Sequence, residues 1–120
     1  MQSNQYIKGT IRTIVLKLLA ENPRMYGYEI TQKVAELSSE QIQLTYGALY
    51  PILYKLEGEG MLSTETELVD SRARKYYALT EKGQKVAIEK ISELQQFLKT
   101  MEQLMKPDPS GKLSLQVWGA

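Results

Sequence analysis

Hydrophobic residues repeat with a helical period through the first half of the chain. From about residue 8 to residue 21 they recur at i, i+3/i+4 and i+7, which predicts a helix with one broad apolar face. Asn22-Pro23 ends this helix, because the residue before a proline disfavours the helical conformation. A second helix is predicted over residues 27–37. A third is expected to begin at Thr45, a favourable N-cap, and to end at the glycines of residues 58–60.

The period changes from 3.6 to 2 between residues 61 and 79. Residues 61–68 are polar and rich in threonine, which indicates a short exposed strand. Residues 73–79 (ARKYYAL) form a stronger strand pattern because they include adjacent tyrosines. Residues 69–72 are expected to be the loop between them, although they lack the Asn-Gly or Asp-Gly signal of a tight turn. The pattern predicts a two-stranded hairpin.

Thr80 is expected to cap a long last helix, from residue 81 to about residue 105. Its apolar residues step by four and three along the sequence, like the a and d positions of a coiled coil. These positions are Ala87, Ile91, Leu94, Leu98, Met101 and Met105. Such a seam packs either against the chain's own core or against a second copy. A helix of ~25 residues is ~37 Å long, longer than a core of three short helices, so we favour a homodimer that also involves Ile11.

These patterns divide the chain into three parts. Residues 1–80 form the expected globular domain, residues 81–106 the dimerisation helix and residues 107–120 a tail. Prolines and a glycine open the tail, which then carries alternating apolar residues and the only tryptophan, Trp118. A docking strand, a disordered end and a remnant of cloning all remain open for it.

Composition narrows the chemistry. The chain has 120 residues, of which 42% are apolar and 24% charged, as in an ordinary globular domain. It has no cysteine and no histidine, which removes thiolate chemistry, the usual general base and the commonest zinc ligands. We therefore expect no enzyme activity, no metal site and no cofactor. The chain shows no secretory signal pattern and no stretch long enough to span a bilayer, so a cytoplasmic protein without a membrane partner is expected.

Charge must be judged locally, because the net charge is only +1 and gives no general basic excess. Arg72, Arg74 and Lys75 lie at the end of the predicted loop and the start of the second strand. Cations placed there suit phosphate contacts that fix a protein's position on DNA. The alternative is that they protect an edge strand. Some of these cations are expected to pair with Glu65, Glu67 or Asp70.

The third helix has an unusual outer face. With Leu49, Leu53 and Leu56 inward, the opposite face consists of Gly47, Tyr50, Pro51 and Tyr54, with Lys55 at its edge. A proline inside a helix costs ~3 kcal/mol, and a local rule broken on an exposed face indicates function. The alternatives are tyrosines that are half-buried in the core or in an interface, and a regular helix that begins late.

Three helices followed by a hairpin are the order of a winged helix-turn-helix, whose third helix enters the major groove of DNA. Several motifs also resemble those of the PadR family of transcriptional regulators. They are YGYEI at 26–30, TYGALYPIL at 45–53, KLE at 55–57 with Gly60, RKYY at 74–77 and LTEKG at 79–83. The resemblance spans about residues 7–105. It implies a mainly α (α+β) fold and a bacterial, cytoplasmic, homodimeric repressor that binds a palindromic double-stranded DNA operator.

The resemblance also implies roles for particular residues. It places Thr45, Gly47, Ala48, Tyr50, Pro51 and Lys55 on the recognition helix, and Arg72, Arg74 and Lys75 on the wing. Tyr46 and Tyr54 depart from the smaller or more basic residues of many relatives, so the operator preference does not transfer. The single last helix resembles the short-tailed branch of the family.

Some short-tailed relatives bind flat aromatic drugs against a tryptophan in the last helix, and this chain has none there. A small apolar or aromatic effector would instead meet Val15, Phe97 and Met101. The rival interpretation of the whole chain is a protein-binding winged-helix adaptor that does not bind DNA, and salt dependence would separate the two.

Overall fold

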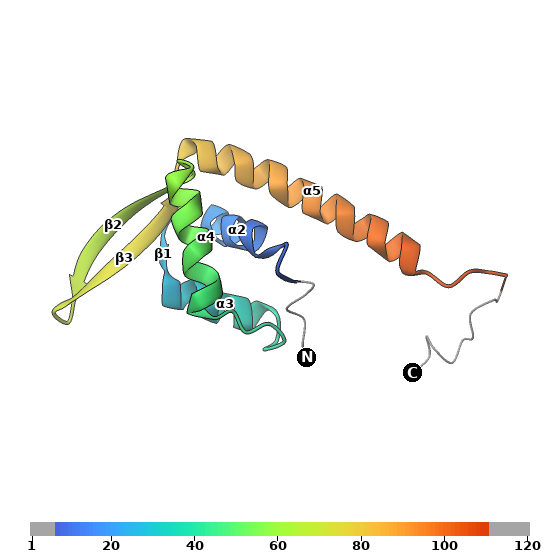
Figure 1. The fold of residues 1–120 in the computed structure, drawn as a ribbon, viewed down its shortest axis with the longest axis horizontal. Coiled ribbons are helices and arrows are strands. Elements are labelled where there is room, and N and C mark those ends of the chain that lie inside the picture. The colour runs from blue at the N-terminus through green and yellow to red at the C-terminus, as the bar shows by residue number, and fades with distance from the viewer. Residues whose placement is uncertain (1–6, 111–120) are drawn as a thin grey trace.

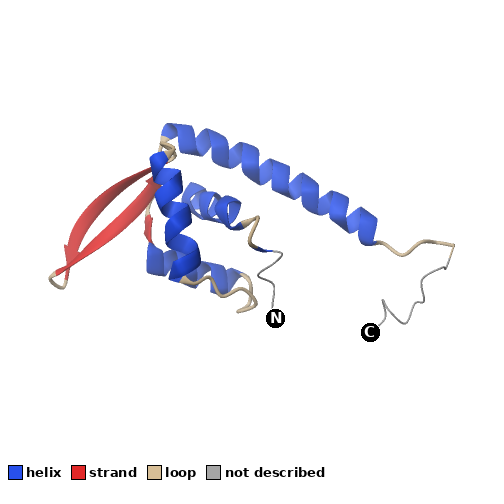
Figure 2. Cartoon of the chain, in the orientation of Figure 1, coloured by secondary structure: helices blue, strands red, loops and turns tan. Residues whose placement is uncertain are grey.

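The computed structural model describes residues 7–110. Its elements, in order, are α2 (Ile11–Glu21), β1 (Met25–Tyr26), α3 (Gly27–Leu37), α4 (Tyr46–Gly58), β2 (Leu62–Val69), β3 (Arg72–Leu79) and α5 (Glu81–Met105). Helices α2, α3 and α4 gather in the centre, the β2–β3 hairpin projects on one side, and α5 extends past them on the other (Figures 1 and 2). This arrangement confirms the predicted mainly α (α+β) winged helix fold.

Helix boundaries follow local capping chemistry. Thr45 Oγ1 accepts a hydrogen bond from the Ala48 N–H at 3.2 Å, and Thr80 Oγ1 accepts one from the Gly83 N–H at 3.0 Å. Both threonines are therefore N-caps, as predicted. Helix α2 has no such side-chain cap and begins at Ile11, three residues later than expected.

The sheet has one strand more than the sequence predicted. Met25 and Tyr26 of β1 pair antiparallel with Tyr77 and Tyr76 of β3, which gives the order β1-β3-β2. The hairpin loop is also shorter than expected. Val69 pairs with Arg72, so the turn consists of Asp70 and Ser71 alone.

Both turn residues adopt left-handed backbone conformations, with φ of 51° at Asp70 and 64° at Ser71. Two successive positive φ angles are what a two-residue hairpin turn of type I′ requires. Aspartate tolerates this conformation better than most residues, and here serine adopts it as well. The turn therefore forms without the glycine that signals it in most sequences.

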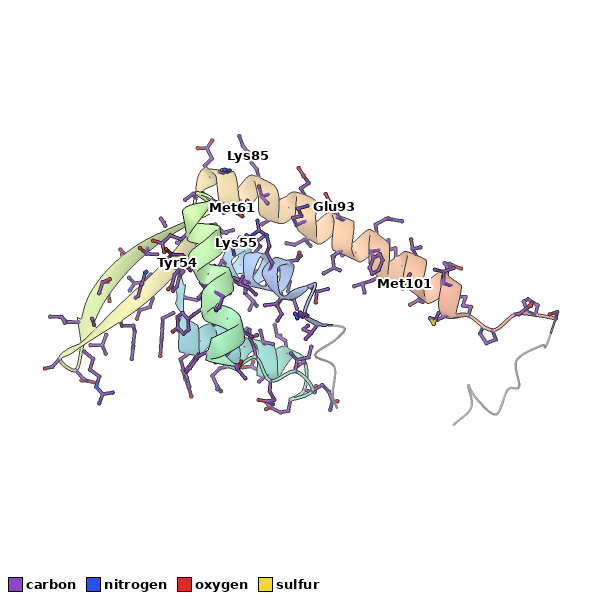
Figure 3. All side chains as sticks on the ribbon, in the orientation of Figure 1. Tyr54, Lys55, Met61, Lys85, Glu93 and Met101 are labelled. Carbon is purple, nitrogen blue, oxygen red and sulfur yellow. The ribbon has the colours of Figure 1, made fainter. Side chains whose placement is uncertain are left out.

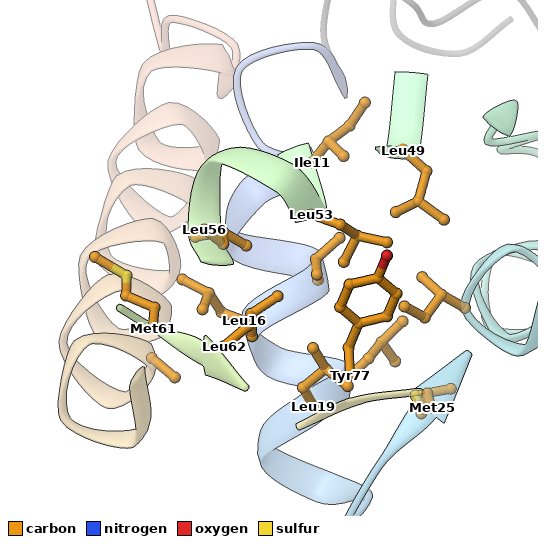
Figure 4. Close-up of a cluster of buried hydrophobic side chains, with 14 of the residues drawn as sticks. Ile11, Leu16, Leu19, Met25, Leu49, Leu53, Leu56, Met61, Leu62 and Tyr77 are labelled. Atoms are coloured by element: carbon orange, nitrogen blue, oxygen red, sulfur yellow. The ribbon is translucent and has the colours of Figure 1, made fainter. Parts of the chain in front are cut away.

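The core lies where α2, α4 and the base of the hairpin meet (Figure 4). Leu49, Leu53 and Leu56 of α4 are completely buried there, as their spacing predicted. Tyr77 of β3 is also buried, and burial raises the pKa of its hydroxyl. The inner face of α4 is thus fixed by packing, which leaves its other face outward.

The predicted seam of α5 is divided between two environments. Ala87 is fully buried in the chain's own core, and Ile91 is half-buried against it, so this end of the seam packs within the chain. Ile11 of α2 is buried in that core too, which corrects its assignment to the dimer surface. Farther along, Leu98 and Met105 are more than half exposed. Sequence periodicity cannot separate these environments, because both require apolar side chains at the same spacing.

Candidate nucleic-acid interface

The outer face of α4 carries three tyrosines, Tyr46, Tyr50 and Tyr54, at successive helical turns. The rings of Tyr46 and Tyr50 have centroids 5.6 Å apart, and Tyr54 is 80% exposed. Figure 3 shows Tyr54 and Lys55 on this helix. Aromatic side chains with hydroxyls combine apolar contact area with a hydrogen-bonding group, which suits recognition of a polar polymer.

Pro51 lies within the continuous helix, so the alternative of a late helix start is wrong. It has no N–H to donate to the carbonyl of Gly47, one turn earlier. Thr45, Gly47, Pro51 and Lys55 are exposed, whereas Ala48 is half-buried against the core. The predicted recognition face is therefore on the surface except at Ala48.

A groove connects this face to the wing. It runs between the start of α3, the first half of α4 and the outer half of β3, and has a volume of about 800 Å³. Its lining residues are Tyr26, Gly27, Tyr28, Tyr46, Tyr50, Val69, Asp70, Arg72, Ala73, Arg74 and Lys75. Tyr26 and Tyr28 are members that the sequence reasoning did not assign to the site. The fold thus brings the tyrosines and the wing cations together.

The three wing cations have different partners. The Arg74 guanidinium lies 4.1 Å from the centre of the Tyr26 ring, a cation–π contact. Lys75 Nζ lies 3.5 Å from Glu57 Oε1 on α4, so its charge is partly matched. Arg72 forms no ion pair with any residue in the part of the chain that the structure covers. Arg72 and Arg74 are therefore the wing cations that remain open to a phosphate.

Glu65, Glu67 and Asp70 were expected to pair with the wing cations, but no such ion pair forms among the described residues. Arg24 Nη1, just before β1, donates to Glu65 at 2.5 Å and to Glu67 at 2.6 Å. The Arg24 hydrogen bond lowers the pKa of Glu67, and Arg24 also lies 3.9 Å from the centre of the Tyr76 ring. Arg24 escaped the sequence reasoning, because its partners lie 41 and 43 residues away and only strand pairing brings them close.

The residues proposed for an effector are not brought together. Val15 is fully buried, Phe97 is exposed and Met101 is half-buried farther along α5. An apolar groove of about 290 Å³ opens elsewhere, between α2, α3 and α5. Its lining includes Ile14, Leu37, Ile91, Leu94 and Leu98.

No cluster of carboxylates among residues 7–110 could hold a metal ion. Over the same range, no helix is both long enough and apolar enough to cross a membrane.

Known proteins share both the sequence and the fold of this chain. Residues 15–89 match the transcriptional regulator PadR-like family. The transcriptional regulator Rv3488 of Mycobacterium tuberculosis is 35% identical over 79 residues, which are 66% of this chain and 70% of that protein. An uncharacterised protein of Lysinibacillus sphaericus is 30% identical over 94 residues, which are 78% of this chain and 85% of that protein.

Solved structures agree. A transcriptional regulator from Clostridium thermocellum superimposes with a TM-score of 0.76 at 28% identity, over 85% of this chain and 99% of that one. A PadR family transcriptional regulator from Eggerthella lenta gives a TM-score of 0.73 at 28% identity, over 87% and 88% of the two chains. The matched family and both of these solved structures are transcriptional regulators. The chain described here is a member of the PadR-like family of transcriptional regulators.

Proposed function

We propose that this protein is a homodimeric repressor that binds a palindromic operator through α4 and the β2–β3 wing. The observation that carries the proposal is the shared groove, which joins the tyrosine face of α4 to Arg72 and Arg74. In a winged helix-turn-helix the helix reads base edges in the major groove and the wing contacts the backbone. Tyr50, Tyr54 and Lys55 are the side chains we assign to the bases or the neighbouring phosphates.

The C-terminal half of α5 supports the proposed dimer. Its apolar side chains Phe97, Leu98, Leu104 and Met105 are all more than half exposed, and Met101 lies among them (Figure 3). An exposed apolar stripe on a helix that extends beyond its own domain is typical of an interface. Two copies joined along this stripe would carry two recognition helices related by a two-fold axis. Such a dimer reads an operator whose half-sites are one helical turn of DNA apart, or a multiple of it.

An apolar effector belongs to the same proposal. The groove between α2, α3 and α5 adjoins the N-terminal end of the exposed stripe and shares Leu98 with it. A ligand held there would favour one position of α5 against α2, and with it one spacing of the two recognition helices.

The chain also fits the short-tailed branch of the family, because within the described residues a single helix, α5, follows the wing.

Footprinting tests the proposal directly. DNA from the region upstream of the protein's own gene is incubated with the wild type and probed for protection. Two protected half-sites, and reduced transcription from that promoter when the protein is added, are the expected results. Protection of a single half-site would contradict the dimeric arrangement, and increased transcription would contradict repression. A protein that protects no DNA at any concentration would fit the protein-binding adaptor instead.

A further inference from the structure

The outer face of the sheet holds two arginines, two tyrosines and two glutamates in one continuous cluster. Strand pairing sets Tyr26, Tyr76 and Glu65 side by side in one row across β1, β3 and β2. In the next row Arg74 of β3 stands directly opposite Glu67 of β2. Directly opposite residues lie on the same face, with Cβ atoms about 5 Å apart.

This pairing makes Glu67 the natural partner of Arg74, since opposite charges that face each other across a ladder attract. The observed contacts are different. Glu67 Oε2 accepts from Arg24 at 2.6 Å, while Arg74 lies over the ring of Tyr26. One guanidinium thus holds both carboxylates of β2, because Arg24 binds Glu65 as well. Arg24 itself is fixed against the Tyr76 ring.

Two of the other carboxylates near Arg74 already have partners. Glu29, in the first turn of α3, accepts the backbone N–H of Tyr26 at 3.1 Å, and Glu57 pairs with Lys75 on the other face of the sheet. Asp70 lines the groove from the turn, but strand pairing places Glu67, not Asp70, directly opposite Arg74. Glu67 is therefore the carboxylate whose release would most directly cancel the charge of Arg74.

We propose that Arg24 is a positioning residue for DNA binding: by holding Glu65 and Glu67, it keeps Arg74 available for a DNA phosphate. Arg24 does this without touching DNA. The inference rests on the proposed function, because it requires Arg74 to contact DNA. Without Arg24, Glu67 would turn to Arg74 and neutralise its charge, and Glu65 would be left without a partner.

The test measures what Arg74→Ala does in three backgrounds. The probe is a fluorescein-labelled duplex of ~30 base pairs of arbitrary sequence, because phosphate contacts are sequence-independent. Anisotropy titrations over a salt series give the slope of log affinity against log salt. In the wild-type background, Arg74→Ala should flatten the slope by up to about 1.8, which is about 0.9 for each of two subunits.

In the Arg24→Ala background the same substitution should change the slope by almost nothing, because Arg74 is already paired with Glu67. In the Arg24→Ala/Glu65→Gln/Glu67→Gln background the full change should return, although Arg24 is still absent. Lys85→Ala is the matched control. It likewise frees a glutamate, Glu81 on α5, outside the residues that line the groove, and the Arg74→Ala change should persist beside it.

Equal changes in all three backgrounds would overturn the proposal, since Arg24 would then act independently, for example by contacting DNA itself. Loss of the change in the triple variant would also overturn it, because Arg24 would then matter only through its packing on Tyr76. If Arg24→Ala does not fold, Arg24→Met covers the same ring without charge and carries the same expectation. A wild type that binds no duplex refutes the proposed function itself, which is a distinguishable result.

Discussion

The phenol of Tyr50, on the outer face of α4, lies directly against the backbone of Gly27 at the start of α3. A Cβ atom built on Gly27 would overlap the Tyr50 hydroxyl and would stand 2.8 Å from Cζ of the ring. The absence of a side chain at residue 27 therefore sets how Tyr50 is held in the groove. Two segments that are far apart in the sequence define one part of the candidate DNA surface.

Gly27→Ala should consequently impair DNA binding more than folding. The half-exposed Tyr50 ring can move outward to make room, so we expect a small change in unfolding free energy, within about 1 kcal/mol. Displacement of Tyr50 should weaken operator affinity about tenfold, or about 1.4 kcal/mol. Anisotropy titrations and urea denaturation measure the two effects. Gly58→Ala is the matched control, because a Cβ there meets nothing within 4 Å and should leave affinity unchanged. Equal affinities for the two variants would show that the position of Tyr50 does not matter.

Gly83→Ala should act on stability instead. A Cβ on Gly83 would overlap the carbonyl oxygen of Met61, which also accepts the N–H of Thr80 at 3.0 Å. Backbone atoms at the junction of β2 and α5 cannot move aside as a side-chain end can, so a loss of about 1–3 kcal/mol is expected. Urea denaturation gives the value. An unchanged midpoint would mean that this junction is looser than its contacts indicate.

The α5 stripe makes a prediction about assembly. Leu98 is 56% exposed in the single chain, so Leu98→Lys should be tolerated in the monomer fold. A lysine buried without a partner in a dimer interface is strongly disfavoured, and sedimentation should show a folded monomer. Ile88→Lys introduces the same change at another exposed position of α5 and should leave the dimer intact. A dimeric Leu98→Lys protein would place the interface elsewhere.

A pH-dependent contribution to stability is expected from the contact between α2 and the end of α4. Arg12 Nη2 donates to Glu59 Oε1 at 2.5 Å, and this hydrogen bond lowers the pKa of Glu59. A carboxylate whose pKa is lower in the folded state stabilises the fold above its unfolded value of about 4.3, and the effect disappears as pH falls through the folded value. Glu59→Gln should therefore lower the urea midpoint at neutral pH.

The effect of the same substitution should shrink as the pH falls from neutral into the acid range, because the Glu59 carboxylate is protonated as the pH passes through its lowered folded-state pKa. Glu89→Gln is the control, since Glu89 is exposed and forms no ion pair within residues 7–110. A Glu59→Gln effect of the same size at neutral and acid pH would indicate packing and not charge as its cause.

Local signals predicted the helices well, because caps and periodicity belong to neighbouring residues. The limits of α3, the caps Thr45 and Thr80, and the buried positions of α4 all follow from them. Strand β1 escaped prediction because two residues have no period, and only pairing with β3 makes them a strand. The hairpin loop was predicted in the right place, over residues 69–72, but its two-residue form at Asp70 and Ser71 was not, because neither is the glycine that usually signals it.

The candidate site shows the same division. The tyrosine face of α4 and the wing cations were found as separate segments, from spacing and charge. The fold brings these two segments into one groove with Tyr26 and Tyr28. This depends on how α3 and β3 pack, which cannot be predicted from local sequence patterns. The Arg24 contacts depend on strand register in the same way. Periodicity likewise could not assign Ala87 to the chain's own core and Leu98 to the surface.

The salt dependence of DNA binding by the wild type tests the central claim most directly. Lys55, Arg72 and Arg74 form no ion pair among the described residues, so a dimer offers up to six phosphate contacts. Anisotropy titrations with a duplex from upstream of the protein's own gene, from about 50 to about 300 mM salt, should give a slope approaching about −5. Binding whose affinity does not change with salt, or no binding to that duplex, would contradict the assignment of α4 and the wing to DNA.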